Sequence, residues 1–161
     1  MLWSSRRAFL ISAAALAGCG FQPAYDTQGM RGLYGQISYS EPTDQNMFHL
    51  RQQLEQRLGA SATGQYRLDY SIETQTERAA VAFDGQAFRQ QIHGEVTYTL
   101  TQNDRSKVIL SGKRSTFVGY ASTGTTTATL ASERDANRRL MVRLADLVVA
   151  DILIKMRSVQ P

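Results

Sequence analysis

The sequence predicts an α+β domain in which a strand, a helix, three further strands and a final helix follow one another along the chain. Apolar residues recur at helical spacing over 47–58 and again over 140–154, and they alternate with polar residues between these segments. A length of 161 residues allows one such domain and leaves no room for a second core. We therefore expect the folded domain to span residues 33–157, after a leader of a different kind.

Residues 1–18 have the order of a bacterial signal peptide. Arg6 and Arg7 lie in a short basic start, and a nine-residue, mostly apolar run follows over 8–16. A membrane-spanning helix needs about 20 apolar residues, so this run is too short to span a bilayer. The tetrapeptide 16–19, Leu-Ala-Gly-Cys, then resembles the lipobox of bacterial lipoproteins, because small residues leave the backbone open to a peptidase and the cysteine supplies a thiol.

Cys19 is the only cysteine of the chain, so no intramolecular disulfide can form. A single cysteine is more often an incidental buried residue, but its position directly after a signal peptide favours lipid attachment. We predict cleavage between Gly18 and Cys19, followed by a covalent diacylglycerol and an N-acyl chain on Cys19. Several acyl chains on one residue give stable membrane anchoring. No other cofactor and no metal is predicted.

The residues around the cysteine also bear on location and export. Gly20 stands where aspartate often signals retention in the inner membrane, so the resemblance favours the periplasmic face of the outer membrane. Residues 5–10 resemble a twin-arginine export signal, but paired arginines are common in ordinary signal peptides and both routes stay open. Removal of residues 1–18 leaves 16 basic and 14 acidic residues, a formal charge of +2, which does not favour a nucleic acid as partner.

The segment 19–32 is predicted to be a lipidated tether, since its glycines and Pro23 occur without a hydrophobic period. A first strand is predicted where Leu33, Ile37 and Tyr39 lie on alternating positions. The strand would place these three side chains on one face.

A short amphipathic helix is predicted next. Pro42-Thr43-Asp44 is typical of a turn that ends in a helix N-cap, and apolar residues repeat at helical spacing over 47–58 before Gly59. Glycine directly after the last apolar residue is the usual stop signal of a helix.

A three-stranded antiparallel meander is predicted from the alternating pattern over 66–73 and 92–100, followed by a strand that starts at Val108. The buried residues of the first two strands are all even-numbered. A two-residue loop at Asp84-Gly85 alone would pair even with odd positions and turn one set of apolar side chains outward. We therefore predict a three-residue loop or a β-bulge near Asp84.

The first hairpin of this meander is predicted to be long, with arms of about 17 residues or roughly 55 Å. One helix layer cannot cover that length. Its outer part is an alanine-rich apolar tip with Arg78 and Arg89 at the base. The tip either projects toward a partner or lipid, or folds back onto its own domain, and both outcomes stay open.

A loop is predicted over 122–129, which is rich in threonine, glycine and serine, and a long helix over 130–156. Apolar side chains cover far more of this helix than the stripe of roughly 100° that an ordinary surface helix needs. We infer that the helix is either sandwiched by its own fold or pressed against another protein. Asp151 interrupts the apolar arc four residues before Lys155, which predicts a local ion pair.

The sequence contains no recognisable catalytic or metal-binding motif. His49 and His93 have neither a neighbouring cysteine nor the spacing of a metal-binding pair, and no nucleophile elbow or phosphate-binding loop occurs. His93 and Glu95 share a strand face, which we interpret as solvated surface rather than as a general base. We predict that the protein is not an enzyme. A lipoprotein hydrolase stays an alternative, which turnover of esters or glycans would test.

Taken together, these features resemble the LptE family of lipopolysaccharide-assembly lipoproteins. The segments that carry the resemblance are Gly-Cys-Gly-Phe-Gln-Pro at 18–23, Leu-Arg-Gln-Gln-Leu at 50–54, Tyr120-Ala121, Asp135-Ala136 and Leu144-Ala145. The resemblance covers nearly the whole chain. It implies a two-layer sandwich in which a four-stranded mixed sheet carries two helices on one face. The strand-helix-strand start agrees with a parallel, right-handed crossover.

The resemblance also implies a function. Family members plug a large outer-membrane β-barrel, LptD, support its assembly and help to deliver lipopolysaccharide to the cell surface. They also bind lipopolysaccharide, whose phosphates favour arginine and lysine. Candidates beside the meander are Arg78, Arg89, Lys113 and Arg114, although each is also explained as a solvated edge charge. The alternative is an auxiliary lipoprotein of a lipid-transporting ABC system, with a similar anchor and sandwich.

Overall fold

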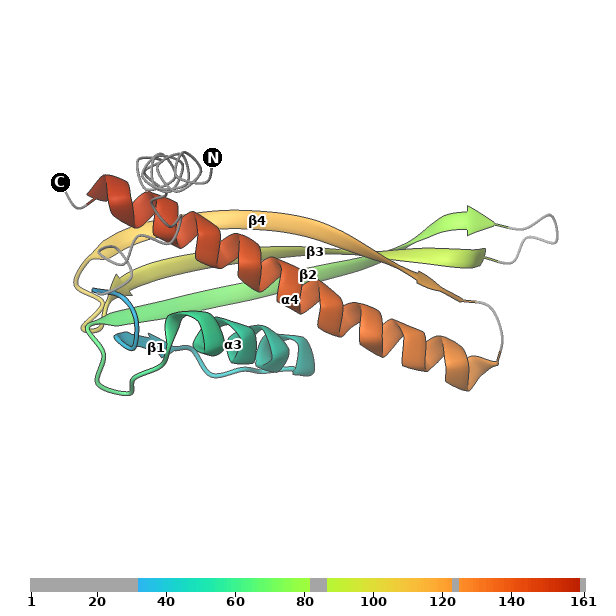
Figure 1. Cartoon of the computed structure of the whole chain (residues 1–161), viewed down its shortest axis with the longest axis horizontal. Helices are drawn as coiled ribbons and strands as arrows, with labels where there is room; N and C mark the ends of the chain where they lie inside the picture. The colour runs from blue at the N-terminus through green and yellow to red at the C-terminus, as the bar shows by residue number, and fades with distance from the viewer. Residues whose placement is uncertain (1–31, 82–86, 123–124, 160–161) are drawn as a thin grey trace, which may run out of the picture.

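The computed structural model describes residues 32–81, 87–122 and 125–159. The predicted signal peptide, the cleavage and lipidation site at Gly18 and Cys19, and the turn at Asp84-Gly85 lie outside the described residues. Figure 1 shows a two-layer arrangement in which the described helices lie on one face of the sheet.

The sheet contains four strands in the order β1-β2-β3-β4, namely β1 (Ile37–Tyr39), β2 (Tyr66–Val81), β3 (Ala87–Gln102) and β4 (Val108–Ala121). β1 runs parallel to β2, and the other neighbours are antiparallel. The predicted four-stranded mixed sheet with a β-α-β-β-β-α chain order is therefore confirmed. Because β1 is short, most of β2 has a neighbour on one side only.

Helix α3 (Gln45–Leu58) begins and ends at the predicted residues. The Asp44 carboxylate accepts a hydrogen bond from the Met47 backbone N–H at 2.8 Å, which confirms Asp44 as the N-cap. At the other end Gly59 has φ of +72°, and its N–H donates to the Glu55 carbonyl at 2.9 Å. A glycine adopts this left-handed conformation without the steric cost of a side chain.

Two predicted boundaries were wrong. Leu33 is fully buried but lies in a turn before β1, because the Gln36 N–H donates to the Leu33 carbonyl and closes the chain on itself. Helix α4 (Thr126–Val159) begins four residues before the predicted start at 130. The Thr125 hydroxyl accepts from the Ala128 N–H at 3.3 Å, so a residue that we assigned to a loop acts as a helix cap.

The predicted parity of the long hairpin is confirmed. Leu68 pairs with Leu100, and even positions stay opposite even positions from Tyr66 to Arg78. The register shifts lie between Arg78 and Val81, so the irregularity falls in the outer part of the β2 arm. Even-numbered side chains of β2 and β3 consequently face the helices, and odd-numbered ones face away.

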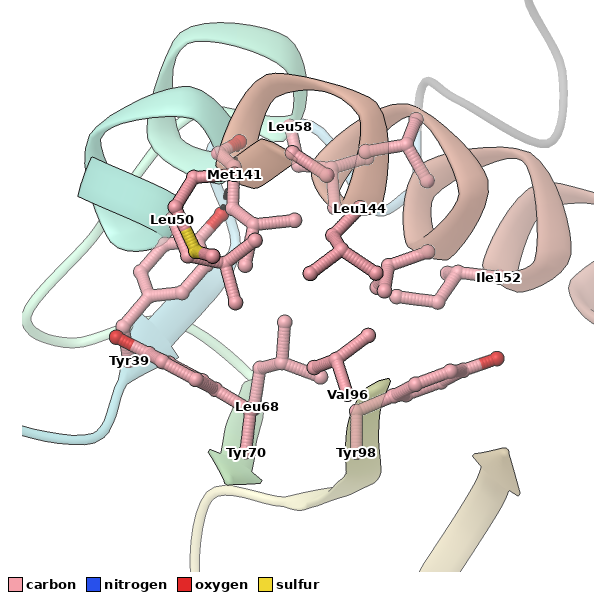
Figure 2. Close-up of a cluster of buried hydrophobic side chains, with 14 of the residues drawn as sticks. Tyr39, Leu50, Leu58, Leu68, Tyr70, Val96, Tyr98, Met141, Leu144 and Ile152 are labelled. Carbon is pink, nitrogen blue, oxygen red and sulfur yellow. Dashed lines mark hydrogen bonds between the residues drawn. The ribbon is translucent and has the colours of Figure 1, made fainter. Parts of the chain in front are cut away.

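The core fills the space between the helices and the even-numbered face of the sheet. Figure 2 shows Leu68 and Val96 of the sheet directed toward Met141 and Leu144 of α4, and all four are fully buried. Gly94 allows this approach, because a Cβ there would lie 2.8 Å from the Leu140 side chain. α4 therefore packs almost directly on the backbone of β3.

The wide apolar arc of α4 is explained largely by its own fold. One flank packs on β3 and β4, and the other packs on α3, where Arg57 also pairs with Asp146 at 2.7 Å. Leu147 and Ile154 remain 37 % and 67 % exposed. Among the described helices, none is both long enough and apolar enough to cross a bilayer.

Candidate functional site

The sheet face opposite the helices is mostly polar. It carries the odd-numbered residues of three strands, because the even-numbered ones fill the core. Its charged and polar members include Asp69, Glu73, Gln75, Glu77, His93, Glu95, Thr97, Lys113 and Ser115. We call this the open face. α3 and α4 lie on the other side of the sheet (Figure 1), so none of the described helices covers the open face.

A hollow of about 460 Å³ lies in the open face where the strands twist past one another. The side chains of Glu73, Gln75, His93, Glu95 and Phe117 contribute to its lining. The rings of His93 and Phe117 lie 5.5 Å apart, and Phe117 is 51 % exposed. Among the described residues, no group of three or more His, Cys, Asp or Glu is arranged to hold a metal ion. The hollow combines one aromatic surface with hydrogen-bonding groups.

Ion pairs between neighbouring strands hold the open face together. Glu73 and Glu95 lie directly opposite each other and repel, and the Lys113 ammonium offsets this repulsion because it pairs with the Glu95 carboxylate at 2.6 Å. The hydrogen bond and charge of Glu95 raise the pKa of Lys113. His93 and Glu95 share this face as predicted, but the His93 ring lies 3.6 Å from the Glu77 carboxylate.

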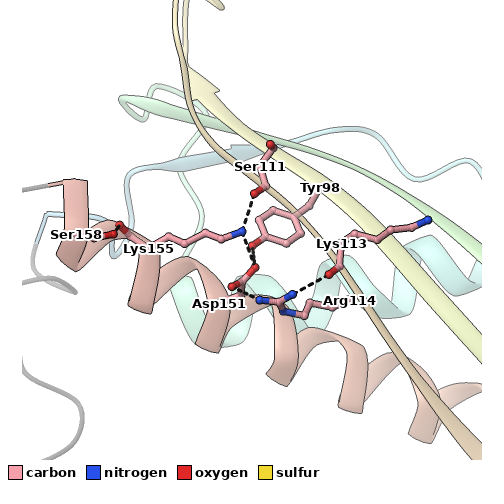
Figure 3. Close-up of polar contacts among 7 residues, drawn as sticks. All are labelled: Tyr98, Ser111, Lys113, Arg114, Asp151, Lys155 and Ser158. Carbon is pink, nitrogen blue, oxygen red and sulfur yellow. Dashed lines mark hydrogen bonds and ion pairs between the residues drawn. The ribbon is translucent and has the colours of Figure 1, made fainter.

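A second polar cluster lies on the helix side of the sheet. Asp151 of α4 is only 5 % exposed, and its carboxylate accepts hydrogen bonds from the Tyr98 hydroxyl and the Arg114 guanidinium. It also pairs with the Lys155 ammonium at 3.0 Å, and Lys155 donates to the Ser111 carbonyl at 2.7 Å (Figure 3). The predicted pair with Lys155 is confirmed, and Asp151 also contacts Tyr98 of β3 and Arg114 of β4. We call Tyr98, Arg114, Asp151 and Lys155 the Asp151 cluster.

The Asp151 cluster shifts the pKa values of its members in opposite directions. Burial by itself would raise the pKa of Asp151, but hydrogen bonds from Tyr98 and Lys155 and the charges of Lys155 and Arg114 lower it. Burial, followed by the hydrogen bond to Asp151, raises the pKa of Tyr98. A carboxylate and a neutral hydroxyl are therefore the stable forms over the ordinary pH range.

The four predicted lipopolysaccharide-binding residues do not meet at one place. Arg78 and Arg89 lie exposed near the outer end of the hairpin, at adjoining register positions. Lys113 lies on the open face in its pair with Glu95. Arg114, the next residue of β4, points to the helix side because neighbouring strand residues face opposite ways, and it belongs to the Asp151 cluster.

Sequence reasoning missed Tyr98 and Arg114 as partners of Asp151. They lie 53 and 37 residues from it along the chain, and no local spacing links them. One available signal was Gly112, where the strand pattern places a small residue on the buried face of β4. A Cβ at Gly112 would lie 2.6–2.8 Å from polar atoms of Tyr98, Asp151 and Lys155, so glycine makes room for the cluster.

The family model of LptE, described as lipopolysaccharide-assembly, matches residues 35–152, which include every described helix and strand in whole or in part. The chain belongs to the LptE family. LptE is a family of non-enzymatic lipoproteins that serve lipopolysaccharide assembly, and this chain is accordingly a lipopolysaccharide-assembly lipoprotein. The comparison with curated proteins gave no match.

Solved structures of lipoproteins share the LptE-like fold. A putative lipoprotein from Caulobacter crescentus is 22 % identical with a TM-score of 0.67, over 83 % of this chain and 98 % of that one. Rare lipoprotein B from Shewanella oneidensis is 11 % identical with a TM-score of 0.59, over 78 % and 98 % of the two chains. A minor lipoprotein from Acinetobacter baumannii is 17 % identical with a TM-score of 0.58, over 75 % and 92 %. The architecture is thus kept while most side chains differ.

Proposed function

We propose that this LptE-family chain plugs an LptD-like outer-membrane β-barrel, supports its assembly and helps to deliver lipopolysaccharide to the cell surface. The observation that carries the proposal is the open face. A plug inside a water-filled barrel needs a surface whose polar groups stay hydrated, and a largely antiparallel sheet with one solvated face supplies such a surface. Here that face runs along strands of 14–16 residues.

The proposal includes a membrane anchor at the start of the mature chain. Cleavage after Gly18 would leave Cys19 as the first residue, with a covalent diacylglycerol and an N-acyl chain. The lipobox-like tetrapeptide and the match to a lipoprotein family support this step. Gly20 beside the cysteine favours location at the periplasmic face of the outer membrane. Mass spectrometry of the mature N-terminus tests the anchor: an unmodified Cys19 would contradict it.

We further propose that lipopolysaccharide phosphates contact basic residues of the meander. Arg78 and Arg89 suit this role because both are exposed on the outer arm of the hairpin, where Arg78 of β2 faces the helix side and Arg89 of β3 faces the other side. Lys113 and Arg114 stay candidates, but each already has a carboxylate partner. An Arg78→Glu, Arg89→Glu chain is expected to bind lipopolysaccharide at least tenfold more weakly than an Arg134→Glu, Arg138→Glu control on α4. Equal binding by the two variants would exclude the outer pair.

Purification of the anchored protein from its native envelope tests the barrel partner. The membrane is dissolved in mild detergent, the complex is washed with about 1 M salt to screen surface ion pairs, and the retained proteins are identified. A large β-barrel protein in near-equal amount supports the plug. An inner-membrane ATPase complex in its place would favour the auxiliary role in an ABC system, and recovery of the chain alone would leave the plug without support.

A further inference from the structure

One end of the domain gathers the first described residues, the β3–β4 turn and the end of α4 (Figure 1). Backbone hydrogen bonds tie the parts together: the Tyr66 N–H donates to the Gln36 carbonyl, and the Asn103 N–H donates to the Gln65 carbonyl. The bond from Lys155 to the Ser111 carbonyl holds the last turns of α4 beside the start of β4. The parts therefore lie together at one end of the domain.

Large apolar side chains are exposed at this end. Tyr34, Val108 and Ile154 are 57 %, 59 % and 67 % exposed, although each lies next to well-packed core residues. A single exposed apolar residue needs no explanation, but three from different segments at the same end indicate a surface that meets something apolar.

Basic residues accompany these apolar side chains. Arg105 and Lys107 lie exposed in the β3–β4 turn, and the Arg105 guanidinium is 4.0 Å from the Asp69 carboxylate. Asp104 in the same turn stays ionised, because hydrogen bonds from the Ser106 hydroxyl at 2.6 Å and N–H at 2.9 Å lower its pKa. The Arg67 guanidinium lies 3.1 Å from the Asp69 carboxylate at the same end, so basic side chains remain in excess. Cations beside apolar groups suit an anionic lipid surface, where each lysine or arginine contributes about 1 kcal/mol.

The predicted lipid anchor at Cys19 is close in sequence to this end of the domain, so this end is the one that can reach the membrane. Only 13 residues separate Cys19 from Gly32 in sequence. Even at full extension a chain of that length spans at most about 45 Å, at roughly 3.3–3.6 Å per residue. The outer end of β2, with its 16 residues, lies about 53 Å from the strand's start. A bilayer that holds Cys19 thus meets the near end first, at a high effective concentration.

From these observations we infer that the surface formed by Tyr34, Arg105, Lys107, Val108 and Ile154 rests on anionic phospholipid. The basic side chains meet the headgroup phosphates, and the apolar side chains lie at the boundary with the acyl chains. The long hairpin then points away from that leaflet. The inference rests on the proposed anchor at Cys19, and it assigns an orientation to the anchored domain.

A tryptophan probe tests the contact. The only tryptophan of the chain is Trp3, in the predicted signal peptide, so a Val108→Trp substitution supplies the one indole of the mature protein. The lipidated chain is placed in vesicles of phosphatidylethanolamine and phosphatidylglycerol at a ratio of about 3:1, without lipopolysaccharide, and brominated acyl chains serve as quenchers. Quenching at least twofold stronger than in a Leu130→Trp control, at the opposite end of α4, is expected. Equal quenching would overturn the inference.

Charge variants test the headgroup contact. Adding Arg105→Glu and Lys107→Glu to the Val108→Trp chain is expected to reduce quenching to the level of the Leu130→Trp control, whereas Arg138→Glu and Arg139→Glu should leave it unchanged. Unchanged quenching in the first variant would exclude recognition of anionic headgroups.

Vesicle flotation separates this inference from the proposed anchor. A chain that fails to float with the vesicles would contradict lipidation at Cys19. A chain that floats with an unquenched indole would contradict the surface contact alone. A Cys19→Ser, Val108→Trp chain carries no lipid and tests the surface contact without the anchor. Quenching of its indole at high lipid concentration supports the contact. Absence of quenching in both the lipidated and the unlipidated chain excludes the contact.

Discussion

At the residue scale, Asp151 joins α4 to the sheet through opposite charge rather than through apolar packing. Its carboxylate meets two cations and a tyrosine hydroxyl, so the charge is compensated although the residue is 5 % exposed. A compensated buried ion contributes little net stability compared with apolar residues, but removing one partner is costly. The cluster therefore selects one register of α4 on β3 and β4.

An Asp151→Asn variant is expected to lose about 2–3 kcal/mol of unfolding free energy. The figure is below the 3–5 kcal/mol of a fully buried pair, because the side chains of Arg114 and Lys155 are 41 % and 35 % exposed and can rehydrate. Urea unfolding measures the loss. An Asp146→Asn control, which breaks an exposed pair with Arg57, should cost less than about 1 kcal/mol. Equal losses would contradict a special role for Asp151.

The lowered pKa of Asp151 makes its contribution depend on pH. A carboxyl group whose folded-state pKa lies below its ordinary value of 3.8 stabilises the fold above that pH, and the contribution is lost as the pH falls through the folded-state pKa. The stability difference between the parent and the Asp151→Asn chain should therefore be constant from pH 7 to about 5 and shrink below pH 3.8. Urea midpoints at each pH measure it. A difference that shrinks already between pH 7 and 5 would assign the effect to another group.

Gly112 is expected to tolerate no side chain. A methyl group there would lie 2.6–2.8 Å from three polar atoms of the Asp151 cluster, so Gly112→Ala should lose about 1–3 kcal/mol. Gly119, on the same strand, is the matched control, because its Cβ would meet only the Gln90 carbonyl at 3.7 Å. Gly119→Ala should be neutral or slightly stabilising, since alanine loses less entropy on folding than glycine. Similar losses at both positions would show that the strand, not the cluster, is sensitive.

At the element scale, the β2–β3 hairpin divides into two parts. Its inner part supplies core residues such as Leu68 and Leu100, whereas the β2 residues from Glu73 to Ala79 are exposed on both faces. The β2 residues from Glu73 to Ala79 thus contribute backbone hydrogen bonds and little apolar burial. Such a segment has low local stability and is available for contact with a partner.

Shortening the hairpin should separate folding from assembly. Replacing residues 79–89 by Asn-Gly keeps the pair Arg78–Gln90 and joins the arms with a turn that favours hairpins. The shortened chain is expected to fold cooperatively with Tm within about 5 °C of the parent, equal to about 1 kcal/mol for a domain of this size. Co-purification of the barrel should fall at least tenfold. A large drop in Tm would instead show that the outer arm stabilises the domain.

At the scale of the whole molecule, the two sheet faces differ in polarity and in what covers them. The helices cover one face (Figure 1) and complete the core. The open face keeps its polar groups and the hollow at Phe117. The proposed barrel partner would lie against the open face, and the proposed lipid contact would lie at the anchored end. The two proposals therefore use separate surfaces and can be tested separately.

A bulky side chain placed on either layer identifies the face that meets the barrel. Thr97 lies exposed on the open face, and Gln56 lies exposed on α3. Thr97→Trp is expected to reduce co-purification of the barrel at least tenfold by steric exclusion, and Gln56→Trp should leave it unchanged. Thermal unfolding checks that both variants fold, since surface changes stay within about 0.5 kcal/mol. The reverse pattern would place the barrel against the helices.

Local patterns in the sequence determined the order and type of the elements. Helical spacing with Asp44 and Gly59 at its ends located α3, and the even-numbered apolar residues settled which face of β2 and β3 is buried. The signals at Cys19 and Gly20 are equally local, so the sequence alone carries the prediction of the anchor. These features depend on residues within a few positions of one another, and sequence displays such relations directly.

Tertiary structure decided the contacts that join distant segments. It placed Arg114 and Tyr98 on Asp151, divided the four basic candidates among different surfaces and gathered Tyr34, Val108 and Ile154 at one end. It also started α4 at Thr126, inside a segment whose composition is typical of a loop. The physical reason is that packing and charge pairing act over distances in space, and a fold brings together residues whose separation along the chain carries no periodic signal.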